Sequence, residues 1–310
     1  HVEADRSGGT RPHFHGLDGL RAVAIVSVLV FHLHEAWLPG GFLGVDVFFV
    51  ISGFLITALL VHELTSTGTL DFRRFWTRRA RRLLPALALV VVVSSLIARL
   101  VDRDLVVALG RQVFGAATFS TNWVEIAAGQ SYFDRTAPAL FMNFWSLAVE
   151  EQFYLFWPLV VFLLVRRVAP KARVATALVV AAGSIVAMGV LLPAGDATRV
   201  YYGTDTHVFG LMLGAALAFA WGSSLRTRLL AVNTRWGHLV TPAAAAVLLL
   251  LMLVLSNDFA VTFRGGIALA SLATGWLLLA GIDRVPGEPR TWLQLALDLR
   301  PLRWLGQRSY

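Results

Sequence analysis

The sequence contains no cysteine, and only 15% of its 310 residues are charged. Without cysteine, the chain has no disulfide bond, no thiolate nucleophile and no cysteine-ligated zinc site. The scarcity of charge and a mean hydropathy of +0.67 exclude an ordinary soluble domain, in which about 25% of residues are charged. Composition therefore favours a membrane protein.

Long apolar stretches fill most of the chain. Each approaches the ~20 residues that a helix needs to cross the hydrocarbon core, and each is continuous rather than alternating, which favours helices over a β-barrel. We expect spans at about 18–37, 42–62, 82–101, 143–165, 173–192, 204–221, 236–255 and 263–282. The predicted fold is all-α and polytopic, with about eight transmembrane helices.

The arginine residues lie in short segments between these stretches, and they predict the topology. The net charge of +8 could suggest a nucleic-acid partner, but this distribution is typical of the positive-inside rule, so we expect no nucleic acid. If every basic cluster lies in the cytoplasm, segment 105–123 cannot cross the membrane. We therefore expect a cytoplasmic N-terminal tail at 1–15, a membrane domain at 16–310, and a re-entrant or surface helix at 105–123.

Arg21 and His32 are two ionisable residues within the first apolar stretch. Their spacing places both side chains on one helix face, about 16 Å apart along the axis. Ionisable groups at membrane depth are costly and usually line a cavity or pathway. Arg21 could instead reach the headgroups along its alkyl stem, so its role stays open at this point.

Asp46 follows His32 across a turn at Pro39–Gly41, as many residues after Pro39 as His32 lies before it. An antiparallel hairpin would place the two side chains at similar depth. A carboxylate beside an imidazole fixes its tautomer and stabilises the imidazolium, as a general base requires. The alternative is that Asp46 is an exposed residue at a helix start.

A second carboxylate lies in the span 143–165. We expect Glu150 about two turns into this span, with Tyr154 one turn further on the same face and Glu151 rotated by about 100°. The span that begins near residue 204 places Asp205 and His207 at its outer end.

A dense basic segment, "RRFWTRRARR", occupies residues 73–82. Six arginines in ten residues exceed what topology needs, although topology alone explains most of them. Arg79 and Arg82 share a helix face, and clustered guanidinium groups suit a polyanionic ligand such as a phosphorylated cofactor. The pattern predicts a charged cytosolic donor with a long flexible arm that reaches His32.

At these residues the chain resembles the membrane acyltransferase 3 family, bacterial integral-membrane enzymes that O-acylate cell-surface glycans. The resemblance covers nearly the whole chain in five ordered motifs. They are "GLDGLRA…FH", "GGFLGVDVFFVISGFLI", "FWTRRARRLLPAL", "FWSLAVEEQFYLFWP" and "YYGTDTHVFGLMLGAALA".

The resemblance implies acetyl-CoA as the donor, a hydroxyl of peptidoglycan or surface polysaccharide as the acceptor, and no metal. It implies that Arg21, Arg79 and Arg82 bind the donor phosphates. His32 would be catalytic, as base or covalent acetyl carrier, with Asp46 or Glu150 orienting it. We expect the acceptor side to be formed by Asp205, His207, Tyr154 and Asn143. Similar proteins often have His at position 143 and Arg at position 207.

The resemblance also implies a multi-pass protein of the bacterial cytoplasmic membrane, in contact with membrane lipids. Family members continue past "LGQRSY", so we expect the last two of about ten helices to be missing here. A transporter or flippase of an anionic or acylated substrate is the alternative function, although no internal repeat supports it. A non-catalytic scaffold is a third interpretation, which the polar residues at matched depth argue against.

Overall fold

The computed structural model describes residues 14, 16–101, 108–129, 140–193, 197–282 and 289–308. Within these ranges the chain is helical and contains no strand, so the all-α prediction is confirmed. The tail expected at 1–15 lies, apart from Phe14, outside the described residues.

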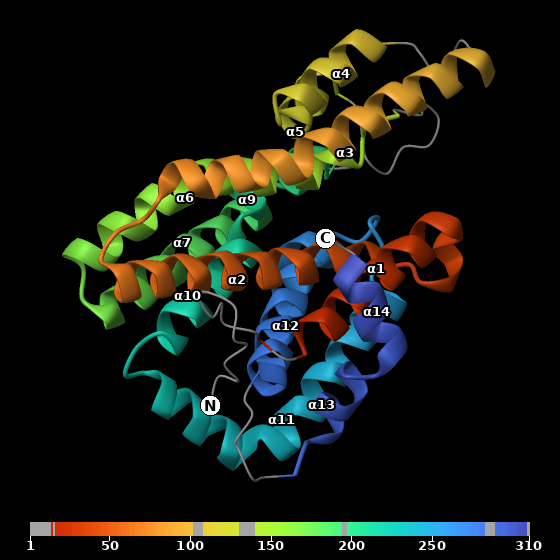
Figure 1. Cartoon of the computed structure of the whole chain (residues 1–310). Helices are drawn as coiled ribbons and strands as arrows, with labels where there is room; N and C mark the ends of the chain where they lie inside the picture. The colour runs from red at the N-terminus through yellow and green to blue at the C-terminus, as the bar shows by residue number, and fades with distance from the viewer. Residues whose placement is uncertain are drawn as a thin grey trace.

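The helices follow one another along the chain in the order shown in Figure 1. They are α1 (Leu17–Leu33), η1 (Glu35–Trp37), η2 (Gly41–Leu43), α2 (Gly44–Thr67), α3 (Phe72–Val101), α4 (Leu109–Ala117), α5 (Thr121–Ala127), α6 (Phe144–Arg167), α7 (Pro170–Val190), α8 (Thr198–Tyr202), α9 (Thr204–His207), α10 (Phe209–Trp221), α11 (Arg226–Val254), η4 (Thr262–Gly266), α12 (Ile267–Ile282), α13 (Trp292–Leu297) and α14 (Arg300–Arg308).

Six helical segments of the described chain are long and apolar enough to cross a membrane. They are Gly41–Thr67, Phe72–Val101, Phe144–Arg167, Pro170–Val190, Arg226–Val254 and Thr262–Ile282. The two other expected spans are helices of 17 residues (α1) and 13 residues (α10). The chain is therefore a polytopic helical membrane protein, with α10 shorter than expected because the helix is interrupted at Val208.

The segment expected not to cross forms two short helices instead of one. α4 has 9 residues and α5 has 7. At 1.5 Å per residue they are about 14 and 11 Å long, too short to span a bilayer. The turn between them contains Phe119 in the left-handed region, with φ 51°.

α2 lies at the centre of the bundle and contacts α1, α6, α10 and α12. Its closest neighbour is α10, because glycines remove the side chains between the two backbones. A Cβ atom on Gly53 would collide with the backbone of Leu211, and one on Gly214 would collide with the carbonyl of Val50. Small residues at such crossings allow close helix packing in membranes.

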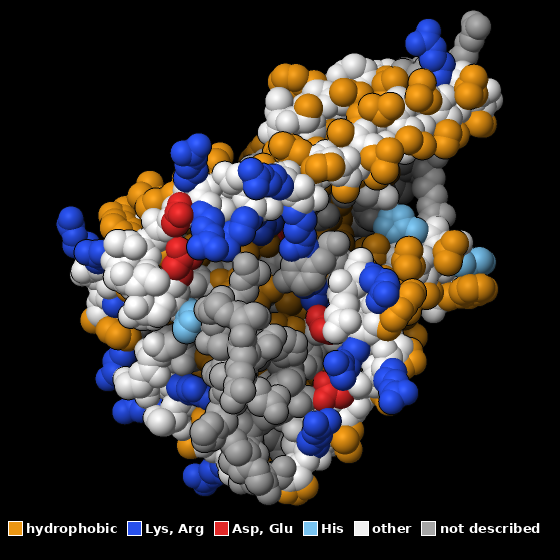
Figure 2. Space-filling model, in the orientation of Figure 1, with side chains coloured by type: hydrophobic (Ala, Val, Ile, Leu, Met, Phe, Trp, Pro, Cys, Tyr) orange, Lys and Arg blue, Asp and Glu red, His pale blue; other side chains and the backbone are white. Residues whose placement is uncertain are grey.

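α3 lies alongside α6, and its far half extends away from the bundle together with α4 and α5 (Figure 1). Lys and Arg side chains gather over its first half, whereas hydrophobic side chains cover its second half (Figure 2). The exposed apolar residues of that half include Leu89, Val92, Val93, Leu96 and Leu100. Such a surface is suited to lipid contact.

Candidate active site

A cavity of about 530 Å³ lies between α1, α2, α3 and α6. Its lining is mainly apolar, with one group of polar side chains drawn from all four helices. The polar group comprises Arg21, Ser52, Arg79, Arg82, Ser146, Glu150, Glu151 and Tyr154. We call this space the central cavity. It brings together five residues singled out from the sequence: Arg21, Arg79, Arg82, Glu150 and Tyr154.

α1 contributes one wall of the central cavity. Arg21, Ile25, Val28 and Leu29 line it at helical spacing, and Arg21 is only 8% exposed. Burial to this extent does not fit an arginine that reaches out to the headgroups. Arg21 faces into the cavity instead, near the Glu150 carboxyl.

His32 lies one turn beyond Val28 and is exposed, outside the residues that line the cavity. Its Nδ1 is 2.8 Å from the Val28 carbonyl oxygen. Because a carbonyl only accepts, Nδ1 must donate, and the neutral ring then carries its lone pair on Nε2. This tautomer is the one that a general base acting through Nε2 requires.

Arg79 lines the central cavity and contacts two residues of α6 there. Its Nη2 is 2.7 Å from the Glu151 Oε1, and its guanidinium lies 3.6 Å above the centre of the Tyr154 ring. Arg79 Nε is buried and has no hydrogen-bond acceptor among the described residues. One donor of Arg79 therefore remains available for a ligand.

Glu151 belongs to the site, contrary to the sequence-based expectation that it points elsewhere. The rotation of about 100° from Glu150 is correct for the Cα positions. The long side chain of Arg79 reaches Glu151, so both neighbouring glutamates face the cavity. In the sequence, two consecutive glutamates in one span and an arginine cluster before another were the available signal for this ion pair.

Glu150 lies close to Ser52 and within electrostatic range of Arg79 and Arg21. Ser52 is also close to the Tyr154 hydroxyl. The three arginines and two glutamates of the cavity leave a formal charge of +1 (3 − 2). The cavity is thus cationic, and its carboxylates sit among the cations.

Asp46 does not orient His32, so that prediction is wrong. Its Oδ1 lies 2.8 Å from Nε2 of His207, and both side chains are completely buried. Nδ1 of His207 lies 2.6 Å from the Tyr201 carbonyl oxygen, so both ring nitrogens are bonded. Depth along a hairpin does not determine rotation, and Asp46 faces α9 rather than α1.

His207 is enclosed instead of facing an acceptor. Four rings surround its imidazole: Phe49, Trp145, Tyr201 and Phe209. Phe49 lines the central cavity and also packs against His207. The buried Asp46–His207 pair therefore stabilises this part of the cavity wall. The other two expected acceptor residues, Asp205 and Asn143, lie outside the central cavity.

Asp205 forms a bidentate ion pair with Arg199, at 2.9 and 2.7 Å. These hydrogen bonds hold the pKa of Asp205 below its ordinary value. Asn143 is exposed at the residue before α6. Neither residue contacts the arginines of the cavity, so an acceptor role for them stays a prediction.

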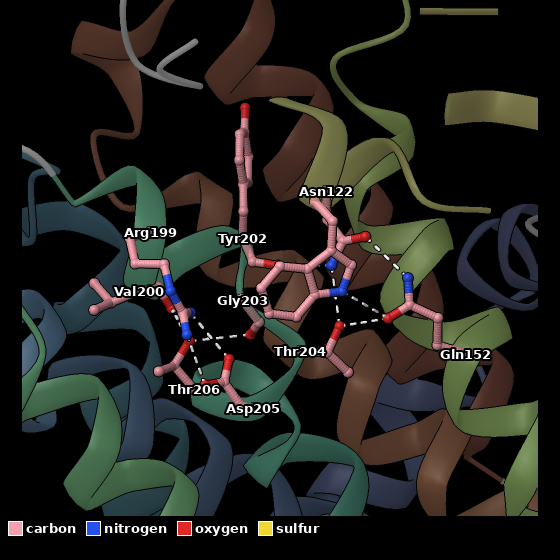
Figure 3. A network of polar contacts seen from close by, with 10 residues as sticks. Asn122, Gln152, Arg199, Val200, Tyr202, Gly203, Thr204, Asp205 and Thr206 are labelled. Atoms are coloured by element: carbon pink, nitrogen blue, oxygen red, sulfur yellow. Dashed lines mark hydrogen bonds and ion pairs between the residues drawn. The ribbon is translucent and has the colours of Figure 1, made fainter. Parts of the chain in front are cut away.

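A polar network that the sequence reasoning missed joins α5, α6 and α9 (Figure 3). Asn122 donates to the Tyr202 carbonyl and to Thr204, both at 3.0 Å. Gln152 accepts from Thr204 at 2.6 Å and donates to Asn122 at 3.0 Å. The network holds α5 and α9 against α6. Its residue on α6, Gln152, directly follows Glu151 of the central cavity.

Metal ligation has no visible basis in the part of the chain that the structure describes. There, no group of three or more His, Asp or Glu side chains could hold a metal ion.

The structure is that of a polytopic helical membrane protein with a cationic, carboxylate-containing cavity among its helices. The chain belongs to the acyltransferase domain family, whose model matches residues 14–310. This membership confirms the resemblance seen in the sequence.

Several curated relatives match the chain. One is "Putative peptidoglycan O-acetyltransferase YrhL" of Bacillus subtilis (strain 168), 41% identical over 302 residues, covering 95% of this chain and 46% of the relative. Another is "O-acetyltransferase OatA" of Staphylococcus aureus (strain NCTC 8325 / PS 47), 35% identical over 300 residues, covering 95% and 48%. The chain thus spans about half the length of these relatives. No solved structure matches it.

Proposed function

We propose that this chain is the membrane domain of an O-acetyltransferase of the bacterial cytoplasmic membrane. It would transfer the acetyl group of cytosolic acetyl-CoA to a hydroxyl of peptidoglycan or a surface polysaccharide. The observation that carries the proposal is the convergence of Arg21, Arg79 and Arg82 on one cavity inside the helices. The names of the relatives support the acetyl group and the glycan acceptor.

The donor fits the cavity by charge. Phosphate groups pair strongly with guanidinium groups, and the buried Nε–H of Arg79 has no acceptor among the residues that the structure describes. The row from Arg21 to Val28 and Leu29 ends one turn before His32, so α1 offers a continuous path from the arginines to the imidazole. A long flexible arm matches the ~16 Å between the two ends.

The chemistry follows from the tautomer of His32. Nε2 takes the proton of the acceptor hydroxyl, whose oxygen attacks the thioester carbonyl. The C–S bond breaks, an ester C–O bond forms, and the proton passes to the departing thiolate. Covalent transfer through the imidazole remains the second route for the same residue.

A transporter or flippase is the competing function, and release of CoA separates the two. We would supply acetyl-CoA and a cell-envelope glycan extract to membranes that carry the full-length protein. An acetyltransferase releases free CoA only when the acceptor is present, whereas a transporter releases none.

His32→Asn and His34→Asn form a matched pair for this assay. His34 lies two residues after His32 in the sequence. It is exposed, and its ring stacks on Trp37. We expect acceptor-dependent CoA release to fall at least about 100-fold in His32→Asn, the usual size of a lost general base, and to persist in His34→Asn. Full release in His32→Asn would refute the role of His32.

A further inference from the structure

A second cavity, of about 290 Å³, lies on the other side of the Arg79–Glu151 ion pair. We call it the lateral cavity. It is formed by α3, α6 and the turn between α4 and α5. Arg79, Leu83, Glu151 and Tyr154 line both cavities, so they form the wall between them.

The lateral cavity offers mainly apolar surface to a ligand. Its apolar lining consists of Ala80, Leu83, Leu84, Phe119 and Leu155, together with the rings of Trp76 and Tyr154. Its polar side chains are engaged within the protein: Arg79 pairs with Glu151, and Thr118 bonds the Phe114 carbonyl and Ser120. Trp76 Nε1 donates to the Tyr154 carbonyl at 3.3 Å, and Gln152 Nε2 donates to the Phe119 carbonyl at 2.8 Å. The ligand must therefore be largely apolar.

The mouth of the lateral cavity is continuous with the lipid-facing surface. Leu84 on α3 and Leu155 on α6 are 47% and 55% exposed. The apolar exposed surface continues along the same two helices through Leu89 and Leu159. Both helices are candidate membrane spans, so the opening between them faces the bilayer.

The α4–α5 turn closes one end of the lateral cavity. Gln152, which holds this turn, lies about 12 Å along α6 from Phe144. Irregular backbone at membrane depth is tolerated where it is buried in protein or lines a cavity. Phe119, with φ 51°, is such a residue, and the network of Gln152, Asn122 and Thr204 keeps it in place (Figure 3).

We propose that the lateral cavity binds one acyl chain of a membrane phospholipid. The chain enters sideways between α3 and α6, and its methyl end lies against Phe119. Its ester end lies toward Trp76 and Arg79, where an amphipathic indole and a cation match the polar boundary of a lipid. Because Arg79 also lines the central cavity, the bound lipid forms part of the surroundings of the donor site.

Photolabelling tests this directly. The full-length protein is placed in nanodiscs with phosphatidylglycerol that carries a diazirine near its acyl methyl end, irradiated, and digested for mass spectrometry. Adducts on Phe119 and Leu83, which are half-buried in the cavity, are measured relative to adducts on Leu89, which is 65% exposed to bulk lipid. This ratio removes the contribution of non-specific labelling.

Ala80→Trp fills the cavity without altering a charge, and Ala88→Trp places the same ring on exposed α3 surface outside it. We expect the ratio to fall about tenfold in Ala80→Trp, because overpacking excludes the chain, and to stay unchanged in Ala88→Trp. Leu155→Trp narrows the cavity from α6 and should act like Ala80→Trp, which keeps the test usable if one variant misfolds. Equal ratios in all variants would overturn the proposal, and this readout does not depend on acyl transfer.

Discussion

Arg79 has two protein partners in the central cavity, the Glu151 carboxylate and the face of Tyr154. A donor phosphate that binds Arg79 competes with Glu151 for the same guanidinium group. The neighbouring Arg78 is exposed and bonds the carbonyl of Arg74 in its own helix at 3.3 Å. The two adjacent arginines therefore differ in environment but not in charge.

Replacement of Arg79 tests the donor site. We expect Arg79→Ala to weaken acetyl-CoA binding about tenfold to 100-fold, because charge-assisted hydrogen bonds contribute about 1.5–3 kcal/mol. Arg79→Lys should lose less, since the charge remains while the forked donors are lost. Equilibrium binding by isothermal titration measures both.

Two further variants complete this series. Arg78→Ala should leave donor affinity unchanged. Glu151→Gln should raise affinity, because it releases Arg79 from its carboxylate. Equal affinity of Arg79→Ala and the unmodified protein would exclude Arg79 from the donor site.

Glu125 on α5 is a buried carboxyl that the proposed reaction does not use. Its side chain is 1% exposed, neither oxygen has a hydrogen-bond partner in the described chain, and Arg111 lies 3.8 Å away. Burial raises its pKa above the ordinary value of 4.5, although Arg111 partly opposes this. The folded state therefore holds the proton more tightly than the unfolded state.

The raised pKa of Glu125 makes the free energy of unfolding depend on pH. As pH rises from 4.5 through the raised pKa, the unfolded state loses its proton first, so Glu125 makes folding less favourable at neutral pH. Glu125→Gln removes this penalty and should raise the free energy of unfolding at pH ~7 by on the order of 1 kcal/mol. Thermal unfolding in detergent should show no gain at pH ~4. A gain of the same size at both pH values would contradict the assignment.

Helical periodicity predicted that Arg79 and Arg82 share one helix face and that Glu150 and Tyr154 share another. It did not predict that Arg21 and Glu150 would line the same cavity as those arginines, because spacing within one helix does not identify its neighbours. The Asp46–His207 bond was not predictable in the same way. It joins α2 to a four-residue helix that no apolar pattern marks, and its partners lie far apart in the sequence. Rotation of a helix about its own axis is determined by packing partners, which a single sequence does not identify.

At the scale of elements, the α2–α10 crossing depends on backbone contact at Gly53 and Gly214. Gly183 on α7 is also helical, but a Cβ there would meet no atom within 4 Å. The two kinds of glycine allow the effect of packing to be separated from that of helix propensity.

Gly53→Ala should destabilise the protein by about 1–3 kcal/mol, because the added methyl group forces the two backbones apart. Gly183→Ala should be neutral or stabilising by up to about 1 kcal/mol, since alanine favours the helix. Thermal unfolding of both variants in the same detergent gives the comparison. Equal stability of the two would mean that α2 and α10 do not meet at Gly53.

Element positions were largely predictable from apolar length, because crossing a bilayer demands it. Two element boundaries were not predicted. The apolar stretch 204–221 gave no sign of the break at Val208 that separates α9 from α10. The basic segment 73–82 and the following span form the single helix α3, because arginine is a good helix former and side chains, not backbone, respond to the change of surroundings.

At the scale of the whole molecule, the proposed orientation places the arginine-rich connections in the cytoplasm. Single cysteines test it cleanly, since the chain has none of its own. Arg228→Cys lies in a basic segment and Asp258→Cys in the connection that follows α11, and both positions are exposed. A membrane-impermeant maleimide added to intact cells should label Asp258→Cys and leave Arg228→Cys unlabelled until the membrane is opened. The reverse pattern would invert the topology.

In the proposed reaction, the acetyl group of a donor on the cytoplasmic side reaches an outer acceptor by way of His32. The most direct measurement uses sealed vesicles of known orientation that carry the full-length protein, with acetyl-labelled acetyl-CoA on one side and the glycan on the other. We predict labelled acetyl ester on the glycan only when the donor is on the side of the α3 arginines, and a loss of at least about 100-fold in His32→Asn. Ester formation with the donor on the opposite side, or undiminished in His32→Asn, would contradict this account.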